Sequence, residues 1–596
     1  MLLHLFAVVV SAWVAAAFDP LAEPGSLWDS GPVDVCLPLS PSVQHSKKFS
    51  IWASRATQRA YGDIVHLKRC PFLASECLDF REWLLENSYR RQQAIEGMMQ
   101  HAYGRYEAVA FGADETNTLS GEGVDNWGGL SLTMVDALDT LALMGMRAEF
   151  DRAVDWLHQH YREAHSKNLS LNTFESTIRI LGGYLGGWTL AVPDSRQRAM
   201  LAEMAEDIGL RLVKAFYPHA NNRERKTPHL PYSDINLATG EGALLGGYVS
   251  LSEANVGLDL RAATMVTGKP VFAEAAANVR ALLRTHYNVD AGGLLPVLLP
   301  LAPQGMDDFK DIPGNKLGLG ARGDSHYEYL LKEWILGGKS VSSLLRSWHS
   351  SLYKIYHNFN SHAEVDGVGQ DRIADFELYW SVPKMDHLTC FLPGSLALDY
   401  IVRRDHNESD SYSPSTRERW LTSTAFEDLQ VSTGGTLSID QELDWAKNLT
   451  SACIGMYSRI SETGLAPEIT RFDAHGLVDD VGAMHNLLRP EAIEALWYMW
   501  RATGDWYYRE AGWRMARALE RHARTRYGYS SLGNVRKSGS YTGWQPTYFF
   551  SETLKYLYLL FSPDSIGESL GVQDGTLLHH SVYVLNTEGH PYAIPT

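Results

Sequence analysis

The sequence predicts a mainly α-helical protein made of repeated helical units, and three observations lead to this prediction. Apolar segments of helical length recur from Phe80 to the C-terminus. Turns rich in Gly, Pro, Asn and Asp separate them, and strand-like alternation of apolar and polar residues is scarce. Apolar residues make up 45% of the 596-residue chain, including 17 Trp. That content is enough for a large core.

Several of these segments share one form. Each opens with an acidic residue, continues apolar and ends at Gly or Pro, as in residues 135–146, 174–192, 252–268, 489–505 and 551–563. Helices that are apolar nearly all round are buried on most sides. A layered helical array, or a closed toroid of helix pairs, would bury them and leave one end of each helix open. If these ends converge, the acidic first turns line a single pocket.

The N-terminal region differs from the helical body. Residues 1–17 are apolar and end in Ala15, Ala16 and Ala17, which is typical of a signal peptide and short for a membrane span. Because no Lys or Arg flanks this stretch, a short signal anchor is the alternative. Residues 18–79 are rich in Pro, Ser and Gly and are expected to form a stem or irregular extension, and residues 80–596 the helical body.

Charge and cysteine content narrow the class of protein. The chain carries 53 Lys and Arg against 70 Asp and Glu, a net charge of −17, with no basic stripe, so nucleic acid is not an expected partner. Five cysteines (Cys36, Cys70, Cys77, Cys390 and Cys453) predict one or two disulfides and one free thiol in an oxidising compartment. Sequons at Asn168, Asn407 and Asn448 support a lumenal chain.

The acids in the first helical turns have two interpretations. A single acid there usually caps the helix and favours its dipole, and this applies to each of Glu175, Glu253, Glu491 and Glu552. Their neighbours favour a functional role. Arg179 follows Glu175 by one turn, while Arg489 and Glu494 flank Glu491 on the same helix.

Further charged residues precede other helices. Asp324 follows Arg322 in "GARGDSHYEYLLKEW", and Asp386 and His387 lie in "KMDHLTCFLPG". A pocket of carboxylates and arginines suits a neutral ligand rich in hydroxyls. It also suits glycoside hydrolysis, which needs one carboxylic acid and one carboxylate, and crowded carboxylates raise one another's pKa. A hard cation such as calcium fits this excess of oxygen donors better than zinc does. From these residues alone, a hydrolase and a lectin remain open.

Eight motifs occur in the order found in the class I α-1,2-mannosidases of glycoside hydrolase family 47, and from Phe80 onward the chain resembles that family. They are "SLTMVDALDTLALMGM", "FESTIRILGG", "LPYSDINL", "DSHYEYLLKEW", "KMDHLTCFLPG", "HNLLRPE", "SETLKYLYLLF" and "LNTEGHP". The resemblance implies an (α/α)7 barrel that hydrolyses terminal α-1,2-linked mannose of N-glycans with inversion and depends on calcium.

The resemblance also implies roles for individual residues. Glu175 is the expected general acid, acting directly or through a water, and either Glu491 or Asp324 activates the attacking water. Inversion places the acid and base carboxyls about 6.5–9.5 Å apart. Thr587 matches the direct calcium ligand, with carboxylates such as Glu552 and Glu491 holding the coordinated waters. Expected substrate contacts are Arg179, Glu253, Arg322, His387, Arg489, Glu494, Tyr548 and Glu552.

Some positions depart from the family's pattern or refine what it implies. Tyr548 replaces the usual Phe of a stacking platform, and Leu585 and Gly589 change the "FNTEAHP" motif. A buried core imidazole is the alternative for His387. Cys390 and Cys453 match the family's paired cysteines. Arg322 is typical of the endoplasmic-reticulum type, which predicts conversion of Man9GlcNAc2 to one Man8GlcNAc2 isomer.

The second hypothesis is that the protein binds the glycan rather than hydrolysing it. Degradation-associated relatives of these enzymes bind mannose and have weak or partner-dependent activity, and they often carry extra C-terminal domains. This chain ends nine residues after Thr587, which favours the plain enzyme. We expect a monomer in the lumen of the endoplasmic reticulum, rather than a Golgi or secreted protein, with membrane attachment only if the N-terminal segment is retained.

Overall fold

The structure is a computed structural model in which residues 33–36, 65–68, 80–217, 229–243, 247–287, 294–302, 312, 315–365, 368–373, 375–377, 380–409, 437–473, 475–562 and 578–595 are described. The chain divides into two units, Met1–Arg90 and Arg91–Thr596. The expected signal segment, most of the stem, and the side chains of Cys36, Cys70 and Cys77 lie outside the described residues. No described helix is both long and apolar enough to span a membrane.

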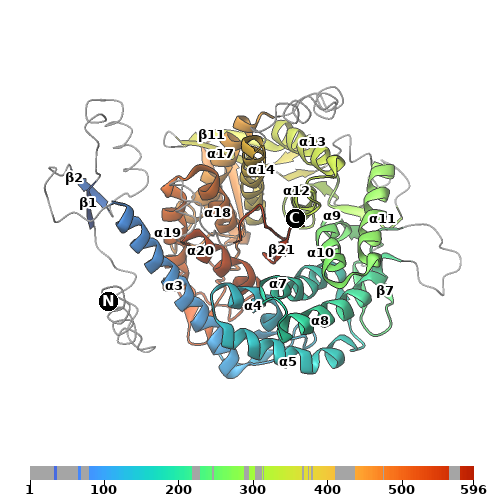
Figure 1. The fold of residues 1–596 in the computed structure, drawn as a ribbon. Coiled ribbons are helices and arrows are strands. Elements are labelled where there is room, and N and C mark those ends of the chain that lie inside the picture. Colours follow the sequence, from blue (N-terminus) through green and yellow to red (C-terminus); the bar gives the residue numbers. More distant parts are fainter. Residues whose placement is uncertain are drawn as a thin grey trace. The chain divides into compact units, whose positions relative to one another are not determined.

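The second unit is a closed ring of helices (Figure 1). Seven inner helices of the described chain follow one another around the ring, and the last returns to the first through the π-helix η7 (Phe549–Thr553). The inner helices are α4 (Leu132–Leu143), α7 (Gly182–Leu190), α10 (Gly257–Thr267), α12 (Asp324–Leu336), α14 (Phe391–Ser409), α18 (Glu491–Thr503) and α20 (Leu554–Leu560). The predicted toroid of helix pairs is therefore correct.

Each inner helix is preceded in the chain by a helix of the outer layer. These are α3 (Phe80–Val109), α5 (Arg147–His165), α8 (Arg196–Leu212), α11 (Pro270–Tyr287), α13 (Ser342–Phe359), α17 (Ile439–Ser458) and α19 (Trp506–His522). The two layers differ in burial, as their sequences require. Outer helix α5 buries one stripe that includes Phe150, Val154 and Leu157, whereas Ala492–Ala502 of inner helix α18 are all buried.

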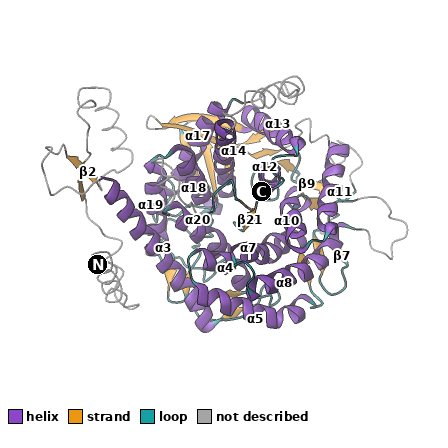
Figure 2. Ribbon diagram, in the orientation of Figure 1, coloured by secondary structure: helices purple, strands orange, loops and turns teal. Residues whose placement is uncertain are grey.

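Short strands at the helix connections are the main feature that the sequence did not predict (Figure 2). Sheets of two or three strands join β3 (Glu115–Thr116) with β4 (Gly123–Val124), β5 (Ser170–Asn172) with β6 (Asp234–Asn236) and β7 (Gly242–Ala243), and β8 (Tyr248–Ser250) with β9 (Leu298–Pro300). Others join β10 (Lys316–Leu317) with β13 (Asp375–Glu377) and β14 (Trp380–Val382), β11 (Asn360–Val365) with β12 (Val368–Ile373), β15 (Lys384–Asp386) with β16 (Ile469–Asp473) and β17 (Gly476–Asp479), and β18 (Arg524–Thr525) with β19 (Gly528–Tyr529). In the first unit, β1 (Val33–Cys36) pairs in parallel with β2 (Val65–Lys68). Most of these strands have two to four residues, which is too few for a period of two to show.

The hairpin of β20 (Tyr583–Leu585) and β21 (Pro591–Ala593) lies inside the ring, where β20 contacts α12 and β21 contacts α7 (Figure 1). Its turn is shaped by Asn586. The side-chain oxygen of Asn586 accepts the N–H groups of Glu588 and His590, and its amide donates to the Ile178 carbonyl. The turn thereby places Thr587 at the centre of the barrel.

Candidate active site

A cavity of about 500 Å³ opens where the N-terminal ends of the inner helices converge. Its wall includes eleven of the residues predicted from the sequence: Glu175, Arg179, Glu253, Arg322, Asp324, Arg489, Glu491, Glu494, Tyr548, Glu552 and Thr587. The acids of the first turns are thus directed into one pocket. The two interpretations are compatible at Glu253, which lines the cavity and also forms a capping box with Ser250.

The turn before α18 carries Arg489 and Glu491 into the cavity. Pro490 is the N-cap and α18 begins at Glu491. Leu488 has a left-handed backbone, with φ of 61°, and its N–H donates to the side chain of Asn486 at 3.0 Å. Thr553 of η7 donates to the Leu488 carbonyl at 2.7 Å. A strained conformation is therefore held from two sides next to the functional residues.

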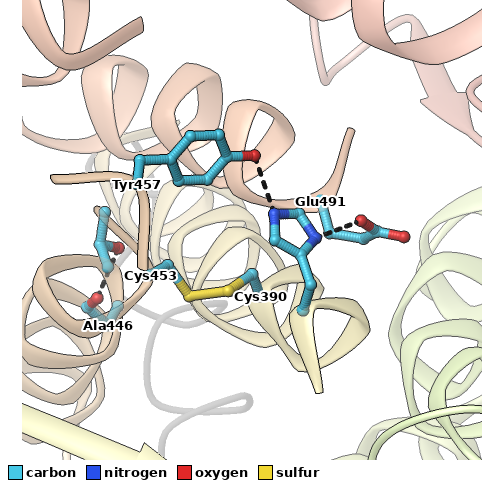
Figure 3. Close-up of a disulfide and its surroundings, with 7 residues drawn as sticks. Cys390, Ala446, Cys453, Tyr457 and Glu491 are labelled. Atoms are coloured by element: carbon cyan, nitrogen blue, oxygen red, sulfur yellow. Dashed lines mark hydrogen bonds and ion pairs between the residues drawn. A yellow bond between two sulfur atoms is a disulfide. The ribbon is translucent and has the colours of Figure 1, made fainter. Parts of the chain in front are cut away.

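His387 holds Glu491 in place and does not line the cavity. Its Nδ1 is 2.9 Å from the Glu491 carboxylate and its Nε2 is 2.8 Å from the Tyr457 hydroxyl. Three residues later, Cys390 forms a disulfide with Cys453 of α17, as the resemblance implied, and Figure 3 shows this bond beside Tyr457 and Glu491. Burial alone would raise the pKa of Glu491, but the hydrogen bond and charge of His387, with the charge of Arg489, lower it. Glu491 is therefore an ionised carboxylate.

The pKa of Asp324 is shifted in the opposite direction to that of Glu491. Its Oδ1 accepts hydrogen bonds from the Ser252 hydroxyl at 2.9 Å and from the Ser325 N–H at 2.8 Å. Burial raises the pKa of Asp324 to about 7, and the charges of Glu328 and Glu491 add to the rise. Arg322, two residues earlier, is exposed and has a left-handed backbone with φ of 76°. The cavity thus contains two carboxyls whose pKa values are shifted in opposite directions.

Glu175 lies on the opposite side of the ring from α18, just ahead of the π-helix η1 (Ser176–Leu181). Its N–H donates to the Asn172 side chain, and its carboxylate accepts from Arg179 Nε at 2.8 Å. Arg179 also pairs with Glu588 and lies 3.6 Å from Asp136. The Arg179 guanidinium therefore pairs with three carboxylates. The Glu175 side chain remains 34% exposed, toward the cavity.

The acidic pair Asp136 and Asp139 of α4 lies behind this wall and is fully buried. Asp139 is 2.8 Å from Lys555 and 2.7 Å from His590. The charge of Asp139 raises the pKa of His590 to about 9, although burial opposes the rise. These residues bind the inner helices to the Thr587 turn and do not contact the cavity.

Two further predicted contacts are fixed by hydrogen bonds. Glu253 forms a capping box with Ser250, and its carboxylate also accepts from Asn172 at 2.9 Å and Ser233 at 3.1 Å. Glu494 accepts from Lys332 at 3.4 Å and from Tyr556 at 3.2 Å. Both side chains are rigid parts of the wall.

Glu552 differs from the other acids, because no hydrogen bond or ion pair joins it to any side chain among the described residues. It is only 6% exposed and lies on η7, which forms the cavity wall. Burial and the negative charges of Glu588, Glu491 and Glu494 raise its pKa well above the usual range. Thr587 lines the same cavity, with its N–H donating to the Tyr329 oxygen at 3.3 Å. A buried carboxylate without a partner beside hydroxyl and carboxylate oxygens matches the donor set of a hard divalent cation.

Sequence reasoning missed several residues of the wall. Glu588 follows Thr587 directly and pairs with Arg179, and Glu328 precedes Lys332 by one helical turn. Both lie within quoted motifs, so their spacing was available as a signal. Asn172 and Ser252 had none, because they act by fixing Glu175, Glu253 and Asp324 across distant segments.

The predicted glycosylation sites have different surroundings. Asn168 is exposed, and its side-chain oxygen accepts from Asn236. Asn448 is half-buried on α17, where its amide donates to Asp371 at 3.1 Å. The side chain of Asn407 lies outside the described residues.

Comparison with known proteins identifies the group to which the chain belongs. The family model described as glycosyl hydrolase family 47 matches residues 98–594. A mannosyl-oligosaccharide 1,2-alpha-mannosidase of Arabidopsis thaliana is 31% identical over 85% of this chain and 79% of its own length. The endoplasmic reticulum mannosyl-oligosaccharide 1,2-alpha-mannosidase of Homo sapiens is 33% identical over 85% of this chain, which spans 64% of that relative.

A solved structure supports the same assignment at the level of the fold. The alpha-1,2-mannosidase from Trichoderma reesei matches 85% of this chain and 99% of its own, with a TM-score of 0.68 and 20% identity. The fold is thus the (α/α)7 barrel that the resemblance implied, and the motif order had identified the family correctly. The chain belongs to glycosyl hydrolase family 47.

Proposed function

We propose that this chain removes terminal α-1,2-linked mannose from high-mannose N-glycans and inverts the anomeric centre. The observation that carries the proposal is one carboxylate-lined cavity in which the pKa of Glu491 is lowered while that of Asp324 is raised to about 7. The names of the Arabidopsis and human relatives point to the same substrate class. Catalysis of this type requires carboxyl groups in different protonation states.

In this mechanism Glu491 is the general base. His387 and Arg489 keep it ionised, so it can accept a proton from water as that water attacks the anomeric carbon. Burial raises the pKa of Asp324 to about 7, so its protonated form is available near neutral pH to donate a hydrogen bond to a sugar hydroxyl or to that water. The lowered pKa of Glu491 supports Glu491 rather than Asp324 as the base.

Glu175 is the general acid, which protonates the departing glycosidic oxygen directly or through a water. Arg179 donates to its carboxylate and Asn172 accepts from its backbone N–H, and both contacts hold the side chain at the cavity wall. Inversion requires the two carboxyls to stand about 6.5–9.5 Å apart, which leaves room for the water. Arg489, Glu494, Glu253 and the ring of Tyr548 position the terminal sugar.

Calcium is the cofactor that suits this cavity. Thr587 would bind it directly, with Glu552 and neighbouring carboxylates holding its waters. When bound, the ion supplies positive charge and an ordered set of oxygen ligands beside the sugar. Its charge would compensate the buried acids, which otherwise raise one another's pKa.

Arg322 at the cavity mouth supports trimming of Man9GlcNAc2 to a single Man8GlcNAc2 isomer, because a long cation there limits which branch enters. The relatives' names support an endoplasmic-reticulum or other secretory-pathway location. The exposed sequon at Asn168 is compatible with glycosylation there. We further propose that the enzyme acts as a monomer.

A digest of Man9GlcNAc2 tests the proposal. Purified protein with calcium should release mannose and give one Man8GlcNAc2 isomer, with β-mannose as the first product seen by NMR, and chelation should stop the release. Glu491→Gln is the matched inactive control, since it retains the side-chain shape. If wild-type protein binds the glycan but releases no mannose with calcium present, the hydrolase proposal is wrong and the chain is a mannose-binding relative instead.

A further inference from the structure

The cavity accommodates only part of a high-mannose glycan. About 500 Å³ holds a few sugar rings, so most of a branched glycan must lie on the surface around the mouth. That surface is formed by the segments that precede the inner helices, because the cavity lies at their N-terminal ends. One of these segments carries an exposed tryptophan, Trp544, that has no role in the site described above.

Trp544 belongs to an exposed patch that we call the 544 patch, made of Leu119, Val124, Tyr541 and Trp544. Their exposed fractions are 50%, 39%, 36% and 40%. The four residues come from two adjacent segments, the β3–β4 hairpin before α4 and the segment before η7. Thr118 is hydrogen-bonded to the Gly543 carbonyl through both its N–H, at 2.8 Å, and its hydroxyl, at 3.2 Å.

A buried carboxylate fixes the indole of Trp544. Glu115 of β3 is 4% exposed, and its Oε2 accepts from Trp544 Nε1 and from the Asn126 amide, each at 2.8 Å. The indole therefore keeps its polar edge toward the protein and its apolar surface toward solvent. A fixed aromatic ring costs little conformational entropy when it binds, and such rings stack on the apolar faces of pyranoses.

The 544 patch lies near the cavity wall along the chain. Thr547, three residues after Trp544, lies 3.4 Å from Arg179, which lines the cavity together with the adjacent Tyr548. Glu115 is also close enough to Arg179 for that charge to lower its pKa, against the rise caused by burial. The patch thus lies close to the cavity, on the side of Arg179.

We propose that Trp544 is a stacking platform for a sugar of the glycan outside the cavity, so that the 544 patch contributes to affinity for the branched substrate. This inference rests on the proposed function for the identity of the glycan. The platform contacts an arm that is not cleaved, and it leaves the chemistry at Glu491 unchanged. Its loss should therefore affect large substrates and spare small ones.

The test compares Man9GlcNAc2 with methyl α-1,2-mannobioside, which is too small to reach beyond the cavity. We expect Trp544→Ala to lower kcat/KM for Man9GlcNAc2 about 3- to 10-fold through KM, the range for one aromatic stacking contact, and to leave mannobioside hydrolysis unchanged. Trp544→Phe should recover most of the loss. Trp188→Ala is the matched control, because Trp188 is half-buried at the C-terminal end of α7 and should change neither substrate.

Binding distinguishes failure of this inference from failure of the proposed function. In Glu491→Gln protein, calorimetry should show weaker Man9GlcNAc2 binding when Trp544→Ala is added, whether or not the wild type is a hydrolase. Equal glycan binding with and without the substitution would overturn the inference. So would a loss seen only with denatured glycoproteins and not with free glycan, since the patch would then bind polypeptide. Release of mannose from neither substrate by wild-type protein would overturn the hydrolase alone.

Discussion

The cavity and the contact between α13, α14 and α17 both bury carboxylates, but the groups that balance them differ. At the helix contact, Asp399 is fully buried and accepts from Trp348 Nε1 while hydrogen-bonding His349, each at 3.0 Å. Arg403 pairs with both Asp399 and Glu442. His349, Asp399 and Glu442 lie close enough together for metal ligands, yet Arg403 already supplies the cation. In the cavity, Glu552 has no such partner among the described residues.

This difference separates structural acids from functional ones. A buried carboxylate costs free energy unless hydrogen bonds or a counter-charge compensate it. Where the fold supplies the compensation, as at Arg403, the acid stabilises packing and leaves no capacity for a ligand. Where compensation is incomplete, as at Glu552, the acid is available to a cation or a sugar. Both clusters have similar composition, so the distinction depends on partners rather than on residue type.

The largest expected effect is at the base. Glu491→Gln keeps the shape of the side chain but cannot accept a proton, so kcat should fall about 10²- to 10⁴-fold. Binding of Man9GlcNAc2 should change little, and the thermal midpoint should stay close to that of the wild type. Single-turnover kinetics and calorimetry measure the two quantities. A variant that retains more than a tenth of the wild-type kcat would exclude Glu491 as the base.

Removing the guanidinium of Arg403 tests whether the buried acids at the helix contact have a structural role. Arg403→Met leaves the buried Asp399 and Glu442 uncompensated, and should cost about 3–5 kcal/mol of unfolding free energy. The activity per folded molecule should be unchanged, because this cluster does not line the cavity. Denaturant unfolding monitored by circular dichroism gives the cost. Arg152→Met is the matched control: its guanidinium is paired with Glu107 but 50% exposed, so it should cost less than about 1 kcal/mol.

Calcium should affect the acids of the cavity rather than those of the helix contact. Because the proposed calcium site exists only in the folded cavity, calcium at 100 times its Kd should add about 2.7 kcal/mol of stability. Glu552→Gln should reduce this gain, and magnesium should reproduce little of it, since magnesium dehydrates reluctantly. Thermal unfolding after chelation and after addition of each ion measures the effect. A thermal midpoint that does not respond to calcium would mean that the unpaired acids bind the sugar and no cation.

The sequence predicted the architecture and most of the charged residues of the cavity wall, for reasons that particular residues illustrate. Apolar helices such as α18 are buried all round, so their role as inner helices could be inferred from composition alone. The acids and arginines at their N-terminal ends then converge because the ring is closed. What could not be inferred is how partners from distant segments divide the charge. His387 and Glu491 are 104 residues apart, and Asp324 and Ser252 are 72 apart.

That division of charge also gives a pH-dependent prediction at Asp324. The folded protein holds the proton of Asp324 with a pKa of about 7, whereas the unfolded chain releases it near pH 4. Between about pH 4 and pH 7, ionisation of this side chain therefore favours the unfolded chain over the folded protein. Raising the pH through this range should lower the stability of the wild type relative to Asp324→Asn, with no further change above pH 7. Denaturant midpoints in chelator at pH 5, 6, 7 and 8 measure this difference. Asp194→Asn provides the control, since Asp194 is exposed and Asn also tolerates its left-handed backbone. A constant difference between Asp324→Asn and the wild type across this range would mean that Asp324 is ionised in the folded state, and the assignment of Glu491 as the only charged member of the pair would then be wrong.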